Sequence, residues 1–393
     1  MPTETHETDL SPGITEEAIA EARELNDVEL RTTDEGVRRR HNWNKEATLD
    51  NFRHYARAYG GDNPLYTNPS YATDTRWDGL VAPPTWLFTV DTTIVAPKLA
   101  GLQWIYAGTK FEFHEPVYRG DEFTVTVRQT DVKRKSGRSV EEFLLQKGVI
   151  EYYNQHDELV ATAEGRTTRV PRPNHADDKN PSADDASIAQ HREPKHWSPQ
   201  ELSDLEDLIL DQSRRGAETR YWDTVSEGDK IEPRIKGPLS VTDMICWYMG
   251  WGSPVYFSHE LYIKERQAHP SEAFRRSDTG IYEHPAMGHL DPTVAVGIGV
   301  PRAYDVGQQR LAWAAHAVTD WMGDDGFLRS FDMRLNGMNY LGEVTYCRGT
   351  VTDVYMDEET DEHLVDLDLE GVTHHHKVQN MSGECTVRLP TSD

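Results

Sequence analysis

The order of sequence segments in the first half of the chain recurs in the second half, and this repeat restricts the fold more than any other feature. Each half has a short helical segment, a loop with a proline, a longer helical segment and then several alternating, strand-like segments. Matched residues lie 190 positions apart at Pro64 and Pro254 but 222 apart at Gly120 and Gly342, so the second half carries an insertion. The repeat predicts two units of one fold, with the insertion near residues 263–302.

The longest helical pattern covers Pro301–Trp321. Its apolar face is formed by residues at intervals of four, three and four, namely Leu311, Ala315, Val318 and Met322. Several alanines keep this helix thin enough for other structure to surround it. Asp305 is of a residue type that caps helices, and Gly307 lets another group approach the first turn. The unpaired N–H groups there suit a carbonyl oxygen that gains negative charge, so the pattern indicates an ordinary capped core helix or a helix that starts at a reacting carbonyl.

Composition limits the classes of protein to which this chain can belong. Its 393 residues, 37% of them hydrophobic, suffice for two domains with separate cores. Three cysteines make a disulfide framework unexpected, and no apolar run has the length of a signal peptide or a membrane span. The formal net charge of −26 argues against nucleic-acid binding, which needs clustered Lys and Arg. We expect a cytoplasmic protein that binds neither nucleic acid nor membrane.

A polar segment separates the two repeated halves. Residues 171–199 are rich in Pro, Asp, Asn, Ser and Lys and have few apolar residues, which is typical of a linker. We therefore expect an N-terminal extension at 1–40, a first domain at 41–170 and a second domain at 200–393.

Five segments resemble the two-domain form of the MaoC-like dehydratases, also called R-specific enoyl-CoA hydratases. They are AYGGDNPLY at 58–66, GLVAPP at 79–84, FEFHEPVYRGDEF at 111–123, YNQHDELVA at 153–161 and VQNMSGECTVRLP at 378–390. The first half looks like the dehydratase domain that is often placed first in such chains. The resemblance implies an α+β double hot-dog fold, in which each unit is an antiparallel β-sheet wrapped around a long central helix.

The family's catalytic signature runs Gly-Asp-x-Asn-Pro-aliphatic-His, and this chain departs from it in both halves. When Asn63 and Pro64 are aligned with the signature, Asp62 is displaced by one position and Tyr66 replaces the histidine. When Pro254 is aligned with it, neither catalytic residue is in place. The resemblance thus supports the fold better than it supports the usual hydratase mechanism.

Four residues are candidates for proton transfer in water addition, which needs a base, an acid and donors to the enolate oxygen. Tyr304 and Asp305 precede the long helix, Asp62 lies in the displaced signature, and His259 follows the loop of the second half. We expect Asp305 to be the base, because Gly307 lies where the family places a glycine whose N–H holds the thioester carbonyl. Asp62 with His259 is the alternative, and a turn, a cap or a surface position would explain each residue equally simply.

Other candidates would bind the substrate. Asn63, Tyr66 and Tyr256 can hydrogen-bond an acyl thioester, and Gly307 can hold its carbonyl oxygen. The phosphates of coenzyme A call for a local basic patch, for which the candidates are Arg134 and Arg138 at a hairpin tip, with Lys133 and Lys135, and Arg302 in the insertion, with Arg275 and Arg276. Arg310 and His316 of the long helix are expected to pair with acidic neighbours.

The resemblance favours an acyl-CoA hydratase or dehydratase, a lyase that adds water reversibly to a 2-enoyl-CoA-type thioester with a non-standard acid–base pair. One alternative is a catalytically inactive hot-dog protein that binds an acyl thioester or a partner subunit, and another is a thioesterase-type hydrolase. His284, His289 and Asp291 lack the regular spacing of a zinc site, so no metal is expected. We expect no cofactor beyond the coenzyme A of the substrate, and a homo-oligomer.

Overall fold

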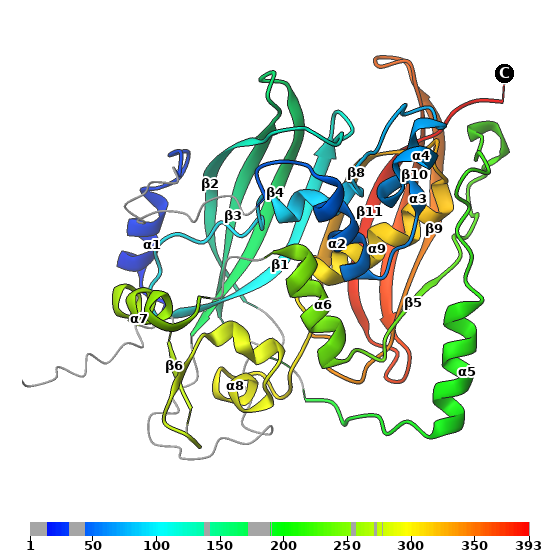
Figure 1. The fold of residues 1–393 in the computed structure, drawn as a ribbon. Helices are drawn as coiled ribbons and strands as arrows, with labels where there is room; N and C mark the ends of the chain where they lie inside the picture. The colour runs from blue at the N-terminus through cyan, green and yellow to red at the C-terminus, as the bar shows by residue number, and fades with distance from the viewer. Residues whose placement is uncertain are drawn as a thin grey trace, which may run out of the picture.

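The structure of the chain is a computed structural model that describes residues 14–30, 44–136, 142–171, 189, 191–252, 257–270, 273–276 and 278–392. A nine-stranded antiparallel sheet runs through both halves of the chain (Figure 1). In spatial order its strands are β2 (Thr124–Lys135), β3 (Phe143–Tyr153), β4 (Leu159–Pro171), β1 (Leu102–Phe113), β8 (Phe327–Leu335), β11 (Gln379–Arg388), β10 (Glu362–Thr373), β9 (Thr345–Asp357) and β5 (Arg234–Lys236).

Strand β1 joins the two halves, because it pairs with β4 on one side and with β8 on the other. Phe111 lies opposite Phe331 in the β1–β8 ladder, and both side chains are fully buried. The strands of the first half thus form one part of the sheet and those of the second half the other. This arrangement confirms the expected α+β double hot-dog.

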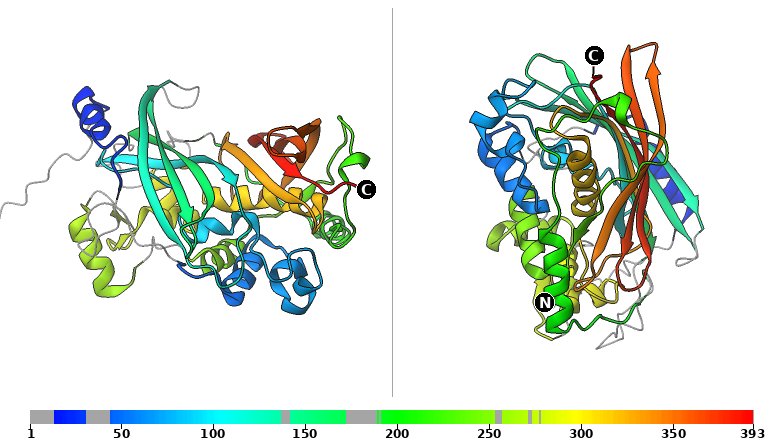
Figure 2. Two further views of the ribbon diagram at one scale, coloured as in Figure 1. Left: turned by 90° about the horizontal axis from the view of Figure 1, so that it is seen from above. Right: turned by 90° about the vertical axis from the view of Figure 1, so that its right-hand side faces the viewer.

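Helix α9 (Gly307–Met322) is the central helix of the second half. Each of its residues is buried, as expected for a thin, alanine-rich helix surrounded by other structure. Figure 2 shows α9 between the sheet on one side and the helices α2 (Leu49–Tyr59) and α6 (Val241–Trp251) on the other. The long helix predicted from the pattern around Leu311 is therefore present in its predicted place.

Among the described residues of the first half there is no long central helix, so the expectation of one in each unit is wrong there. The expected segment forms only a short 3-10 helix, η1 (Pro84–Thr89), and then continues as irregular backbone to β1. The β-branched residues 92–95 disfavour a longer helix, and Pro97 would interrupt it. Gly165 makes room for this backbone, because a Cβ there would lie 1.7 Å from the carbonyl oxygen of Thr93.

Helices α2 and α6 are the corresponding short helices of the two halves, and they pack against each other. A Cβ on Gly250 would lie 2.3 Å from the carbonyl oxygen of His54, so only glycine permits this close approach. Thr48 caps α2 at its start, and Gly60 ends it with a left-handed φ of 76°. The short helices α3 (Pro64–Thr67) and α4 (Pro69–Thr73) follow.

The remaining elements lie around this framework. Helix α1 (Glu16–Arg23) packs through Ile19 and Ala22 on residues of β1, β2 and β3, and α5 (Pro199–Leu210) and η3 (Trp222–Thr224) precede β5. The region of the expected insertion contains most of α7 (His259–Ala268), followed by β6 (Phe274–Arg275), β7 (Tyr282–Glu283), η5 (Pro285–His289) and α8 (Pro292–Gly297). The domain boundaries themselves stay predictions, and most of the linker lies outside the described residues. Across the described ranges, no helix has both the length and the apolar character that crossing a membrane would require.

Candidate active site

Three ionisable side chains meet beside helix α9, and we call Lys236, His316 and Asp320 the α9 cluster. His316 and Asp320 lie one turn apart on α9, with Nε2 of the imidazole 3.1 Å from Oδ2 of the carboxylate. Lys236, in β5, places its Nζ 2.8 Å from Nδ1 of His316. Arg234 of the same strand forms an ion pair with Asp320. The imidazole therefore has a cationic group at one ring nitrogen and a carboxylate at the other.

The α9 cluster lies beside the loop that resembles the family signature in the first half. The ring of Tyr59, the last residue of α2, packs edge-on against His316 with ring centroids 5.0 Å apart. The carbonyl oxygen of Tyr59 accepts a hydrogen bond of 2.7 Å from Nζ of Lys236. A Cβ on the next residue, Gly60, would lie 3.4 Å from the same nitrogen. Groups from both halves of the chain therefore surround the imidazole.

Burial sets the protonation of the α9 cluster. His316 is 9% exposed, and burial together with the nearby charge of Lys236 lowers the pKa of the imidazole to about 4. Burial also lowers the pKa of Lys236 to about 8. At pH 7 the imidazole is neutral while Lys236 still carries its proton. The contact between them thus joins a proton acceptor to a proton donor, and of the two groups Lys236 has the pKa closer to neutral.

Asp305, the base expected from the sequence, is enclosed in a buried ion pair. Its carboxylate accepts a hydrogen bond of 2.7 Å from Nε of Arg310 and has 0% exposed side-chain surface. Asn339 lies 3.4 Å from the same carboxylate. Val306 occupies the N-cap position of α9, so the expected capping role of Asp305 is wrong. The geometry favours a role in fixing the start of α9 over the expected role in proton transfer.

The other candidates at the start of α9 are packed as well. Tyr304 is 9% exposed, and its ring centroid lies 4.2 Å from that of His289. At Gly307, a Cβ would lie 2.3 Å from the ring of Tyr106. At 1.5 Å per residue, Gly307 and His316 are about 13 Å apart along the helix. The start of α9 and the α9 cluster are therefore separate places, and one small reacting group cannot contact both.

The signature residues of the first half have different environments. Asp62 lies at the surface, and its carboxylate forms an ion pair with Arg214. The side chain of Asn63 caps α3 and donates a hydrogen bond of 2.8 Å to Asp324, just after α9. Tyr66 is buried, and burial raises the pKa of its hydroxyl group. This loop is therefore attached to the end of α9, but Asp62 and Tyr66 do not reproduce the family's Asp–His pair.

The remaining candidates lie on separate elements. His259 is exposed at the first position of α7. Arg134 is paired with two glutamates, and Arg302 donates to two backbone carbonyl groups. Tyr256 and Arg138 lie outside the described residues. The hairpin tip as described is therefore partly neutralised by its own carboxylates, and Arg134 and Arg302 do not form one basic patch.

Sequence reasoning missed two of the three residues of the α9 cluster. The spacing of His316 and Asp320 places them on one face of a helix, and this signal was available in the sequence. Lys236 has no such signal, because only the pairing of the three-residue strand β5 with β9 brings it to α9. Within the described part of the chain, no group of three or more His, Cys, Asp or Glu side chains could hold a metal ion.

Comparisons with known proteins match both the first half and the whole fold. The family model of the FAS1-like dehydratase domain region matches residues 35–163. A UPF0336 protein of Streptomyces avermitilis is 30% identical over 102 residues, which are 24% of this chain and 68% of that protein. A UPF0336 protein of Thermobifida fusca is 28% identical over 102 residues, covering 24% of this chain and 67% of the relative.

Solved structures share the fold at low sequence identity. A structure described as a MaoC-like dehydratase is 18% identical, with a TM-score of 0.58 over 88% of this chain and 95% of that chain. A putative MaoC domain protein dehydratase from Chloroflexus aurantiacus is 12% identical, with a TM-score of 0.52 over 88% and 93% of the two chains. Together with the match of the first half, these likenesses agree with the double hot-dog built from β1 to β11. The chain belongs to the family of the UPF0336 proteins, its residues 35–163 match the FAS1-like dehydratase domain region, and its fold is that of the MaoC-like dehydratases.

Proposed function

We propose that the chain is a hydratase or dehydratase of a 2-enoyl thioester of coenzyme A, and that the α9 cluster moves the proton. One observation carries this proposal: a neutral, buried imidazole lies between Lys236 and Asp320, next to the loop that resembles the family's catalytic signature. The match of residues 35–163 to the FAS1-like dehydratase domain region supports a reaction of the dehydratase type. The cluster supplies an acid–base group where the signature itself has lost its Asp–His pair.

The reaction requires balanced movement of protons. In hydration, the oxygen of water bonds to the β-carbon of the enoyl group, one proton leaves the water, and one proton reaches the α-carbon. In this proposal Lys236 gives its proton to the α-carbon and His316 takes one from the water at Nδ1. Transfer of that proton from the imidazolium to the neutral amine across their 2.8 Å contact then restores both groups. Asp320, 3.1 Å from Nε2, stabilises the imidazolium that forms when His316 is protonated.

A second candidate function is binding of an acyl thioester without catalysis. It is favoured by the loss of both signature residues in each half and by the enclosure of Asp305 by Arg310. In this case the α9 cluster would fix the seam between the halves by its hydrogen bonds. Both functions include binding of an acyl thioester, but only the first includes its turnover.

Hydration of crotonyl-CoA tests the proposal, with His316→Asn as the decisive variant. Asn can still accept a hydrogen bond from Lys236 but cannot take up a proton, and removing a general acid–base group lowers the rate about 10²- to 10⁴-fold. His156→Asn makes the same chemical change on an exposed turn and serves as the matched control. Lys236→Met is expected to lower the rate as His316→Asn does.

The outcomes separate the two functions. Turnover by the unaltered protein that is lost in His316→Asn, with an unchanged melting temperature and unchanged CoA affinity, supports catalysis by the α9 cluster. Full turnover in a folded His316→Asn variant rejects this assignment. Calorimetric binding of crotonyl-CoA without any turnover supports the binding function, and the absence of both binding and turnover rejects both.

A further inference from the structure

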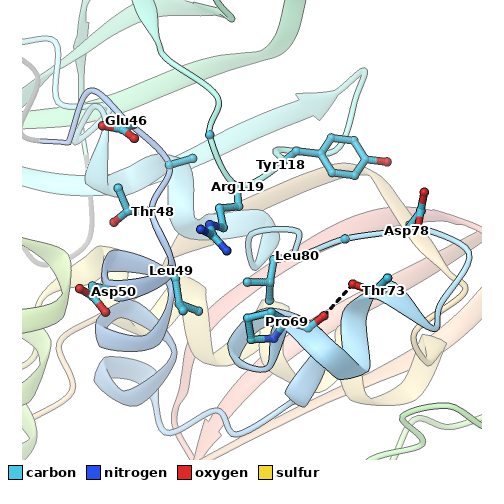
Figure 3. Close-up of a pocket in the computed structure, with 13 residues that line it drawn as sticks. Glu46, Thr48, Leu49, Asp50, Pro69, Thr73, Asp78, Leu80, Tyr118 and Arg119 are labelled. Carbon is cyan, nitrogen blue, oxygen red and sulfur yellow. Dashed lines mark hydrogen bonds between the residues drawn. The ribbon is translucent and has the colours of Figure 1, made fainter.

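A pocket of about 780 Å³ lies at the start of helix α2, apart from the α9 cluster. Its walls come from the first turn of α2, from α4, and from the two turns at residues 78–80 and 118–120 (Figure 3). Ten residues of α2, about 15 Å at 1.5 Å per residue, separate Leu49 at this pocket from Tyr59 at the cluster. The volume is within the range of sites that bind small molecules. The pocket is therefore a second candidate binding site.

The pocket contains charges of both signs that do not neutralise one another. Among the described residues, Arg119 forms no ion pair, although Glu46, Asp50 and Asp78 line the same pocket. In Figure 3, the guanidinium group of Arg119 lies near the centre of the pocket, with Glu46 and Asp50 toward one side and Asp78 toward the other. Charges of opposite sign that face one cavity without pairing are complementary to a ligand that carries both charges itself.

The charge balance of the pocket excludes simpler ligands. A polyanion such as a nucleotide would meet three carboxylates for a single cation, so repulsion would outweigh its contact with Arg119. A simple cation would leave Arg119 without a partner and close to a like charge. A ligand with one carboxylate and one ammonium group satisfies both signs, because the carboxylate can pair with Arg119 while the ammonium group pairs with Glu46, Asp50 or Asp78.

An apolar wall completes the pocket. Leu49, Pro69 and Leu80 line the pocket between the charged groups with hydrocarbon, and Leu80 continues into the buried core. Such a wall accommodates a short aliphatic or aromatic side chain. A small molecule with a carboxylate, an ammonium group and an apolar side chain is complementary to the charges and to the wall.

We propose that this pocket binds a small zwitterion of the amino-acid class. The carboxylate of the ligand pairs with Arg119, its ammonium group is held by the surrounding carboxylates, and its side chain lies on the wall formed by Leu49, Pro69 and Leu80. The site is independent of the reaction at the α9 cluster, since it rests on different residues at the other end of α2.

Isothermal titration calorimetry on the full chain tests the site with glycine, L-leucine and L-phenylalanine. Two analogues of leucine each lack one charge: 4-methylpentanoate has no ammonium group, and 3-methylbutylamine has no carboxylate. We expect saturable binding of L-leucine or L-phenylalanine, and binding at least about tenfold weaker for both analogues, because each loses a charge-assisted hydrogen bond. Arg119→Gln is expected to weaken amino-acid binding by a similar factor, whereas Arg334→Gln, an exposed arginine on β8, is expected to leave it unchanged.

Three results would overturn the proposal. They are the absence of binding by all three amino acids, equal binding of either leucine analogue, and undiminished leucine binding in Arg119→Gln. Arg119 is exposed, so this variant is expected to keep the melting temperature of the unaltered protein and to report on the pocket itself. Because the measurement is binding, neither supporting nor opposing results depend on turnover at the α9 cluster.

Discussion

His316 makes the stability of the fold depend on pH in a way that a single substitution can isolate. The pKa of a histidine in an unfolded chain is about 6.5, whereas burial lowers the pKa of His316 in the folded protein to about 4. Between these two pKa values, His316 is therefore protonated in the unfolded chain but not in the folded protein. Protonation of His316 in the unfolded chain therefore lowers the free energy of unfolding as the pH falls from about 6.5 toward 4, and it has no effect above about pH 7.5.

The size of the effect follows from the two pKa values. The full difference corresponds to about 3 kcal/mol below pH 4, and about 2 kcal/mol of it is already present at pH 5. His316→Asn removes the titrating group and keeps an acceptor for Lys236, so this variant should lose less stability between pH 7.5 and pH 5 than the unaltered protein does. The difference between the two losses should be about 2 kcal/mol. Burial also lowers the pKa of His289 to about 4, but both proteins contain this residue, so its contribution cancels in the difference.

Urea unfolding at pH 7.5 and pH 5, followed by circular dichroism, measures this difference. The control is His156→Asn, which should lose as much stability on acidification as the unaltered protein. Equal losses in His316→Asn and in the unaltered protein would show that His316 is protonated as easily in the folded chain as in the unfolded one. The description of a neutral, buried imidazole in the α9 cluster would then be wrong.

Three further substitutions test other parts of the structure by urea unfolding. Arg310→Met leaves the carboxylate of Asp305 buried without its cation and should lower the free energy of unfolding by about 3 to 5 kcal/mol; a loss below 1 kcal/mol would contradict a buried ion pair. Gly165→Ala brings a methyl group against the carbonyl oxygen of Thr93 and should cost about 1 to 3 kcal/mol, and an unchanged value would contradict this close approach. Asp62→Asn removes an ion pair whose carboxylate is 87% exposed and should change the free energy of unfolding by less than about 1 kcal/mol. A larger loss would contradict the exposed position of Asp62.

The fold could be predicted from the sequence where the pattern was periodic. The apolar stripe through Leu311 and Val318 and the repeated order of segments led to α9 and to the double hot-dog. The prediction of a long helix in the first half is wrong for a local reason. Residues 92–95 are all β-branched, which disfavours a helix, and their irregular backbone packs against Gly165 instead. The repeat gave the order of the elements, but it could not reveal that one copy of the long helix is replaced by coil.

The candidate site was less predictable, because it depends on contacts between distant segments. Asp305 looked like a reactive cap, but Arg310, only five positions later, encloses its carboxylate. The same helix carries His316 with Asp320, a pair that the sequence could show. Lys236 reaches His316 only because β5 pairs with β9 at the edge of the sheet. No local sequence pattern predicts this contact.

The pairing of β1 with β8 also has a consequence for biosynthesis. Residues 114–326 separate the two strands, and at ordinary translation rates their synthesis takes roughly 10 to 40 s. During this time one edge of β1 has no strand to pair with, and an open edge is a template for aggregation. Lys110 and Glu112 lie on the stretch of β1 that later pairs with β8 and form an ion pair of 2.5 Å. Charged side chains at that position discourage the nascent first half from adding a strand of another molecule before its own β8 arrives.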